Sequence, residues 1–400
     1  MMNIPFSPPD IQEDDIREVV DTLHSGWITT GPKTKLFEKQ LSAYCHTDCT
    51  VCLNSATAAL EMTLRALGVG PGDEVITCAY TYTASASVIV HVGASPVLVD
   101  AQPDNVQMDY DKLEAAITER TKAVIPVDLA GVLCDYDRIY EIIERKRALF
   151  HPNNDLQAAY GRIIVLADAS HALGARKNGK MCGEFADFTA FSFHAVKNLT
   201  TGEGGAVTFK KHPGVDIDAL YHQFQLLSLH GQSKDALAKT KIGAWEYDIV
   251  APFFKCNMTD IMASLGISQL RRYDRMIARR HEIIARYDAA LPALSATALR
   301  HSGPDFRSSG HLYLMRLEGA DVQKRNAFIT AMAEKGVATN VHYKPLPMHT
   351  AYKALGFDIQ DFPNAYHLYE NEVTLPLHTC LTDEQVDYIL ESAEKSRAEI

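Results

Sequence analysis

A lysine between two apolar runs is the side chain best suited to covalent chemistry in this sequence. Lys197 follows the aromatic run FTAFSF (188–193) and precedes the run AVTF (206–209). Burial between two strands would lower the pKa of its amine and make it a nucleophile, as Schiff-base chemistry with an aldehyde cofactor requires. A lysine on a surface turn is an equal alternative for this segment taken alone.

An aspartate ends a further apolar run, IIVLAD (163–168). A buried carboxylate at Asp168 needs a partner, and the cationic ring nitrogen of a cofactor would serve. The alternative is that Asp168 caps a short helix over ASHAL (169–173). His171 lies about one turn above the carboxylate, and a structural role is an equal alternative for it.

The segment NSATAAL (54–60) begins a predicted helix directly after a predicted strand. Free backbone N–H groups and hydroxyls at a helix start form an anion site, which suits a phosphate. A well-capped helix without a ligand is the simpler alternative for this segment alone.

Three of the eight cysteines lie close together in YCHTDCTVC (44–52). The spacing of Cys45, Cys49 and Cys52 could hold an iron–sulfur cluster with three thiolates. The alternative is a turn that leads into a buried strand over 50–53. The other cysteines are scattered, as is typical of small buried side chains in a reducing compartment.

Alternating strand-like and helix-like segments between residues 74 and 209 must position these groups. Nearly continuous apolar strands between helices indicate a parallel sheet covered on both faces, with its chemistry at the carboxyl ends of the strands. Asp100, Asp128 and Asp168 lie at such ends. The pattern predicts strands over 96–100, 122–129 and 162–168, and helices over 83–91, 109–116 and 136–147.

The remaining segments predict a second, smaller domain. A long helix is expected from 259 to about 291, and shorter elements follow it. These are a strand over 311–317, a helix over 321–335 and a strand over 337–343. The polar stretch 151–162 is interpreted as a loop or insertion able to alter the substrate entrance.

Composition narrows the classes of partner. The 400 residues carry 39 basic and 50 acidic side chains, a net charge of −11. This balance argues against nucleic acid and against an anionic membrane surface as partners. The N-terminal residues lack the basic flank and apolar core of a signal peptide, and no apolar run is long enough to cross a membrane. We therefore expect a cytoplasmic protein.

Together the segments resemble the DegT/StrS-type nucleotide-sugar aminotransferases, which are fold-type I pyridoxal-phosphate enzymes. The resemblance covers nearly the whole chain. It implies an α/β fold with a mostly parallel seven-stranded sheet between helices in a large domain (1–260) and a smaller C-terminal α+β domain (261–400). The family has no metal at the three-cysteine segment, which disfavours the iron–sulfur alternative. The matching segments are NSATAAL, TYTASASVIVHVGASPVLVD, VDLAGV, ADASHALGA, FSFHAVKNLTTGEGGAV, CNMTDIMASLGISQL and VHYKPLP.

The resemblance implies a pyridoxal 5′-phosphate site with no metal. Lys197 would carry the cofactor and move protons, Asp168 would pair with its ring nitrogen, and His194 is a third candidate catalytic residue. Asn257 would reach the phosphate of a neighbouring subunit's cofactor, so the resemblance implies a homodimer with shared sites. The chain departs from the family at positions 55–57, where the family commonly has Ser-Gly-Thr and this chain has Ser-Ala-Thr. The other cofactor contacts would come from His171, Tyr82, Ala56, Thr57 and Ser192.

The resemblance also implies a reaction, which is transfer of an amino group from L-glutamate to a keto-sugar nucleotide in polysaccharide or glycan biosynthesis. With His194 at this position, the chain resembles the family members that act at carbon 4. Members that act at carbon 3 tend to carry Tyr-Pro in place of His194 and Ala195. A UDP-4-keto-6-deoxy-hexose is therefore the expected substrate. The alternatives are a sugar 3-aminotransferase, a sugar dehydratase, in which histidine replaces the lysine, and a regulatory protein on an inactive aminotransferase fold. Candidates for binding the diphosphate are Lys33, Lys35, His342 and Lys344.

Overall fold

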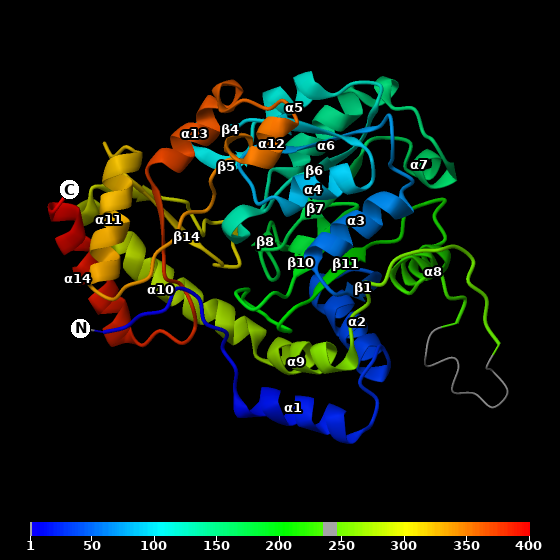
Figure 1. The fold of residues 1–400 in the computed structure, drawn as a ribbon, viewed down its shortest axis with the longest axis horizontal. Helices are drawn as coiled ribbons and strands as arrows, with labels where there is room; N and C mark the ends of the chain where they lie inside the picture. The colour runs from blue at the N-terminus through cyan, green and yellow to red at the C-terminus, as the bar shows by residue number, and fades with distance from the viewer. Residues whose placement is uncertain (1, 235–245) are drawn as a thin grey trace.

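A seven-stranded sheet organises the larger part of the molecule (Figure 1). The computed structural model describes residues 2–234 and 246–400. Strand β11 runs antiparallel to both of its neighbours, and the other neighbouring pairs are parallel, so the predicted mostly parallel seven-stranded sheet is confirmed. In spatial order the strands are β1 (Cys49–Leu53), β11 (Gly205–Phe209), β10 (Phe188–Ser192), β7 (Ile164–Asp168), β6 (Thr121–Ile125), β2 (Glu74–Cys78) and β3 (Ser95–Val99).

Helices cover both faces of this sheet. Along β7, Val165 and Ala167 belong to one apolar core while Ile164 and Leu166 belong to another, as expected when successive side chains point to opposite faces. The strand is therefore buried on both sides, as its continuous apolar sequence predicted. The helices of this part are α2 (Pro32–Cys45), α3 (Ala56–Ala66), α4 (Ala84–His91), α5 (Tyr110–Ala116), α6 (Tyr136–Arg145) and α8 (Ile217–Ser228).

The predicted long helix over 259–291 is two helices. Helix α9 (Asp260–Arg271) ends at Arg272, whose φ of −111° and ψ of 7° leave the helical region, and α10 (Tyr273–Leu294) follows. The Arg272 guanidinium bonds to the buried carboxylate of Asp15 in α1 (Glu13–His24). The apolar spacing continues across the break without a glycine or proline, so the sequence pattern did not reveal it.

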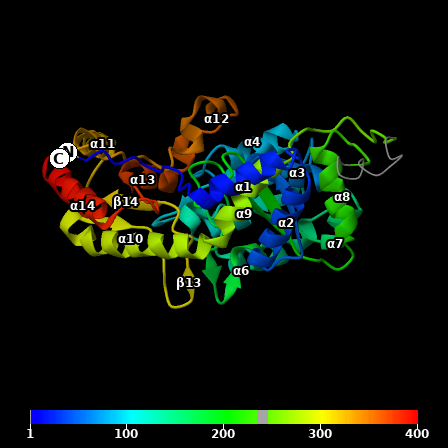
Figure 2. The same ribbon diagram turned by 90° about the horizontal axis from the view of Figure 1, so that it is seen from below.

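A three-stranded antiparallel sheet and three helices, one of them α10, form a third apolar core at the C-terminal end. The sheet has the order β12 (Ala296–Ala298), β14 (Tyr313–Leu317), β15 (Glu372–Leu375), and α11 (Val322–Glu334) and α14 (Asp383–Ala398) contribute to its core. Ile4 joins this core by pairing with Val337, so both termini lie at this end (Figure 2). The division at 260/261 stays a prediction.

The predicted strand over 337–343 is wrong. Only Val337 and Asn340 form single bridges to other segments. The next two backbone N–H groups bond to side chains instead of a neighbouring strand: that of Val341 to Asn340 and that of His342 to Glu372. Side-chain acceptors of this kind compete with sheet pairing.

The stretch 151–162 contains a helix rather than a loop throughout. Asn154 caps α7 (Asp155–Tyr160), and Gly161 ends it in a left-handed conformation. The side chains of Asn154 and Gln157 donate to the carbonyl of Leu67, which caps the C-terminal end of α3. No residue of this stretch lines the cavity described below, and an effect on the substrate entrance stays a prediction.

The other regular elements connect these parts. They are β4 (Ala101–Gln102), β5 (Asn105–Met108), β8 (Arg176–Lys177), β9 (Lys180–Met181), β13 (Phe306–Arg307), α12 (Thr350–Ala354) and α13 (Pro363–Glu370).

Within the described ranges, no helix is long and apolar enough to cross a membrane.

Candidate active site

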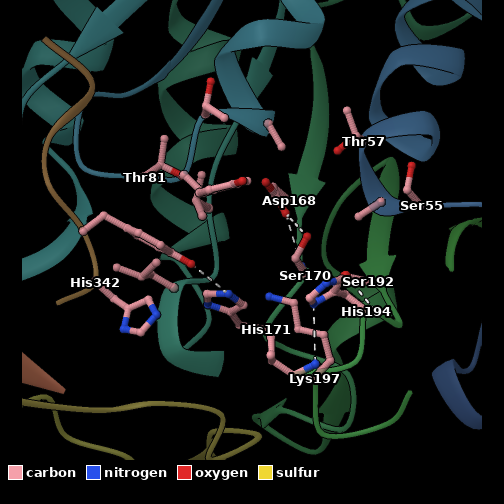
Figure 3. A pocket seen from close by; sticks show the side chains of 18 of the residues that line it. Ser55, Thr57, Thr81, Asp168, Ser170, His171, Ser192, His194, Lys197 and His342 are labelled. Atoms are coloured by element: carbon pink, nitrogen blue, oxygen red, sulfur yellow. Dashed lines mark hydrogen bonds between the residues drawn. The ribbon is translucent and has the colours of Figure 1, made fainter. Parts of the chain in front are cut away.

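A cavity of about 800 Å³ lies at the carboxyl ends of the parallel strands. The start of α3 and the ends of β7 and β10 form part of its wall, and the segment 340–352 closes it from the C-terminal part of the chain. Figure 3 shows Ser55 and Thr57 on one side and His342 on the opposite side, with Asp168 and Lys197 between them. Parallel α/β sheets gather their binding residues at this edge.

The start of α3 supplies free hydrogen-bond donors to the cavity. Ser55 is the N-cap, and its hydroxyl accepts the Ala58 N–H at 3.0 Å. The N–H groups of Ala56 and Thr57 have no acceptor within the helix, because they belong to its first turn. Ser55, Ala56 and Thr57 all line the cavity. These groups form a set of donors at the cavity, and the binding of an anion to them stays a prediction.

Gly205 allows α3 to lie this close to the sheet. A Cβ atom on this first residue of β11 would lie 2.2 Å from the carbonyl carbon of Ser55 and 2.3 Å from the nitrogen of Ala56. Any other residue at position 205 would therefore displace the helix start. Gly205 was not predicted from the sequence, because its contact with Ser55 joins segments 150 residues apart. No local sequence pattern reports such a contact.

Asp168 ends β7 with its carboxylate held from two sides. The Ser85 hydroxyl donates to Oδ2 at 2.7 Å, and the Ser170 hydroxyl and N–H donate to Oδ1 at 2.6 and 3.2 Å. Asp168 is 5% exposed and lines the cavity. No described basic side chain forms an ion pair with it, so its charge is available to a cation in the cavity. The sequence analysis missed both serines.

Lys197 lies in the loop between β10 and β11, and its side chain reaches into the cavity (Figure 3). Burial lowers the pKa of its amine to about 8, although the charge of Asp168 opposes this shift. Among the described residues, none forms a hydrogen bond or ion pair with its Nζ. A free amine with this pKa has a substantial neutral fraction near pH 7, so it can act as a nucleophile or a base.

His171 faces the cavity as a neutral ring. Its Nδ1 accepts the backbone N–H of Ala130 at 3.1 Å, which places the ring hydrogen on Nε2. Burial and the nearby charge of Lys197 hold its pKa well below the usual range. Nε2 lies 3.4 Å from the Tyr343 hydroxyl, and the His311 ring packs at a centroid distance of 4.4 Å.

Three other predicted residues lie at the same cavity, and one does not. The Ser192 hydroxyl accepts the backbone N–H of His194 at 3.4 Å, and His194 Nε2 lies 3.6 Å from the Glu203 carboxylate. Tyr82 is exposed, with its ring centroid 5.8 Å from that of Tyr343. Asn257 does not line the cavity of its own chain; its amide donates to the Thr30 hydroxyl at 2.5 Å.

Of the four candidate diphosphate ligands, only His342 and Lys344 line the cavity. The Lys33 amine is paired with Glu18 of α1, and the Lys35 amine bonds to the Tyr221 hydroxyl. These partners hold the two amines away from the cavity of their own chain. Sequence analysis could not detect them, because each pair joins different helices. It did not single out Tyr343 and Glu203, which also line the cavity.

The structure does not support a cluster at the three-cysteine segment. Cys49 and Cys52 are three residues apart in β1, so their side chains point to opposite faces of the strand. Cys45 ends α2, where burial raises the pKa of its thiol to about 12. All eight cysteines are among the described residues, which contain no group of three potential ligands able to hold a metal.

Comparisons with known proteins agree with this geometry. The spore coat polysaccharide biosynthesis protein SpsC of Bacillus subtilis is 39% identical over 393 residues, which cover 97% of this chain and 96% of SpsC. Spr1654 of Streptococcus pneumoniae, named as a candidate sugar aminotransferase, was solved in a PLP-form. That structure has a TM-score of 0.96 and 57% identity, with coverage of 100% of this chain and 99% of its own.

A more distant solved structure has the same fold. PseC of Helicobacter pylori, an aminotransferase involved in the biosynthesis of pseudoaminic acid, has a TM-score of 0.87 and 28% identity, with full coverage of both chains. The sequence pattern of the DegT/DnrJ/EryC1/StrS aminotransferase family matches residues 9–394. The expected fold-type I architecture is thereby confirmed. The chain belongs to the DegT/DnrJ/EryC1/StrS aminotransferase family.

Proposed function

We propose that this protein is a pyridoxal-phosphate-dependent aminotransferase that moves an amino group from L-glutamate to a nucleotide-linked keto-sugar. The proposed acceptor is carbon 4 of a UDP-4-keto-6-deoxy-hexose, and the proposed setting is polysaccharide or glycan biosynthesis in the cytoplasm. One observation carries the proposal: the unpaired amine of Lys197 shares a cavity with the Asp168 carboxylate and the free donors of α3.

The described residues fit pyridoxal phosphate. The N–H groups of Ala56 and Thr57 suit a phosphate, and Gly205 leaves the space for α3 that brings them to the cavity. Among the described residues the Asp168 carboxylate has no cationic partner within ion-pair distance, so it suits a protonated ring nitrogen. The family membership and the PLP-form of the pneumococcal structure agree with this fit.

When bound, the cofactor supplies an aldehyde that reacts with amines and a ring that delocalises electrons. Lys197 would hold it covalently and be released when the amino donor takes its place. The released amine, with a pKa of about 8, then acts as the base that takes the proton from the α-carbon of the donor. As a general acid it would then deliver that proton to a second carbon rather than back to the first, and the same two roles would serve in reverse for the keto-sugar.

The surrounding residues position and protect this chemistry. Asp168 would stabilise positive charge at the ring nitrogen of a bound cofactor, and hydrogen bonds from Ser85 and Ser170 fix the orientation of its carboxylate. His171 offers Nε2–H to the cavity as a neutral donor, because Ala130 occupies its other ring nitrogen. We assign phosphate contacts to Thr57 and Ser192 and ring contact to Tyr82, since all three line the cavity.

The choice of carbon 4 depends on His194, which lies at the mouth of the cavity beside Glu203. A side chain at this place can set the pose of the sugar, and a displacement of about 1 Å already changes rates strongly. The test supplies 4-keto and 3-keto forms of a 6-deoxyhexose nucleotide with glutamate and locates the new amine by NMR. Amination only at carbon 3 would refute the regiochemistry and leave the aminotransferase assignment intact.

The proposed active unit is a homodimer with shared sites. Asn257 lies outside the cavity of its own chain, as expected if it serves the cofactor of the partner. Apolar side chains are exposed on and near α1, which supports burial of this helix against a second copy; they are Ile11, Ile16, Val20, Leu23, Ile28 and Leu36. Mixing inactive Lys197→Ala and Asn257→Ala subunits should restore activity if sites are shared, and a fully active monomer would contradict the proposal.

A further inference from the structure

A buried carboxyl group outside the active site is linked by hydrogen bonds to the wall of the active-site cavity. Glu372 begins β15, is 2% exposed, and lines a second cavity of about 280 Å³ rather than the active-site cavity. No described basic side chain forms an ion pair with it. The reaction proposed above does not use this residue, so its burial has no explanation in that mechanism.

Two hydrogen-bond routes join Glu372 to His342 of the active-site wall. The backbone N–H of His342 donates to Oε2 of Glu372 at 2.8 Å. Oε1 lies 2.5 Å from the Thr374 hydroxyl, which in turn lies 2.9 Å from Nδ1 of His342. The Tyr80 hydroxyl donates to the His342 carbonyl at 2.9 Å. The peptide groups and one ring nitrogen of His342 are therefore fixed, and no described residue bonds to its Nε2.

The order of donors along this chain depends on one proton. If Glu372 is ionised, Thr374 donates to Oε1, so its oxygen must accept from Nδ1–H, and Nε2 of His342 is left as an acceptor. If Glu372 is protonated, its O–H donates to Thr374, and the Thr374 hydroxyl donates to Nδ1. The ring hydrogen then lies on Nε2 as a donor.

We propose that Glu372 is a positioning residue whose protonation state sets, through Thr374, which nitrogen of His342 carries the hydrogen in the active site. The proton balance is complete. On ionisation the Glu372 proton passes to Thr374 oxygen, the Thr374 hydrogen passes to Nδ1, and Nε2–H leaves to solvent in the cavity, a net loss of one proton.

The electrostatics place this change in an accessible pH range. Burial raises the pKa of Glu372 to about 8, and burial with the nearby charge of Lys197 lowers the pKa of His342 to about 3, so the ring stays neutral throughout. Below about pH 8 Nε2 is a donor, and above it Nε2 is an acceptor. The titratable or charged groups around Glu372 are Arg325 of α11, Arg316 of β14, Tyr80 after β2, His342 and Tyr343 of the wall, and Asp104 across the second cavity.

The test measures the tautomer in the full chain without cofactor or substrate. Histidine-ring ¹⁵N NMR is recorded from pH 6 to about 9.5, and His342→Gln identifies the signals. In the native protein the hydrogen should move from Nε2 to Nδ1 around pH 8. Unchanged His342 ring shifts over this range would overturn the proposal.

Two variants separate the relay from general effects. In Glu372→Gln the amide oxygen must face the His342 N–H, so its NH₂ donates to Thr374 and locks Nε2–H at every pH. Thr374→Val removes the hydroxyl and should abolish the pH-dependent change. Glu370→Gln is the matched control, because Glu370 pairs with His367 and takes no part in the hydrogen bonds between Glu372, Thr374 and His342. This variant should behave like the native protein. Persistence of the change in Glu372→Gln or Thr374→Val would overturn the relay.

The consequence for binding rests on the proposed function. His342 lines the cavity, so the KM for the keto-sugar nucleotide should change about fivefold more between pH 7 and 9 in the native enzyme than in Glu372→Gln, because the titration of Lys197 is common to both. Identical pH profiles of KM in the two proteins would overturn the link to substrate. Because the tautomer measurement uses no substrate, failure of the proposed reaction and failure of the relay are distinguishable.

Discussion

Gly205→Ala tests whether the close approach of α3 creates the phosphate site. The new Cβ would lie 2.2 Å from the Ser55 carbonyl carbon, whereas an ordinary contact needs at least 3.4 Å. The start of α3 must therefore retreat by about 1.2 Å. A hydrogen bond of ~2.9 Å stretched by this amount is effectively lost.

The expected cost follows from the donors that move. The N–H groups of Ala56 and Thr57 would bind a charged phosphate, and such hydrogen bonds contribute about 1.5–3 kcal/mol each. Partial tilting of α3 recovers some of this, so we expect a loss of about 3 kcal/mol, or about 10²-fold in cofactor affinity. Overpacking should also lower the free energy of unfolding of the cofactor-free protein by ~1–3 kcal/mol.

The assay is fluorescence titration of the cofactor-free protein with pyridoxal phosphate and, separately, with pyridoxal, which lacks the phosphate. The loss should appear with the first ligand and largely vanish with the second. Gly70→Ala is the matched control, because a Cβ at position 70 would have only one neighbour, at 3.7 Å. Affinity for pyridoxal phosphate within twofold of the native value in Gly205→Ala would refute the argument.

Three further predictions concern the groups in the middle of the cavity. Borohydride treatment after incubation with pyridoxal phosphate should label Lys197, and Lys197→Ala should lose turnover but still bind the cofactor noncovalently; peptide mapping that finds another labelled lysine would contradict this. Because the neutral amine is the reactive form, the rate at which the cofactor-free protein captures pyridoxal phosphate should rise with pH through about 8 and then level off, as stopped-flow absorbance can show. Asp168→Asn should lower kcat by on the order of 10²-fold or more, whereas Ser85→Ala, which removes one hydrogen bond to Asp168, should lower it about tenfold; equal effects in steady-state assays would contradict the roles assigned.

The short segments with chemical character were predictable from the sequence. Lys197, Asp168 and the start of α3 each follow an apolar strand, and a strand of this kind in an α/β protein ends at the edge where sites form. The capping role of Asp109 was also predictable, because an N-cap depends only on residues within one turn. Its carboxylate accepts the N–H groups of residues 111 and 112.

Only the tertiary structure decided how distant segments complete the site. Ser85 orients Asp168, Gly205 admits the start of α3, and Glu372 holds His342, and each pair joins segments at least 30 residues apart. The failed predictions also involve distant contacts: the helix break at Arg272 coincides with its bond to Asp15 of another helix, and side-chain acceptors replace strand pairing around His342. Local periodicity reports which side chains are buried, but the identity of a side chain's partner depends on contacts that exist only once the chain has folded.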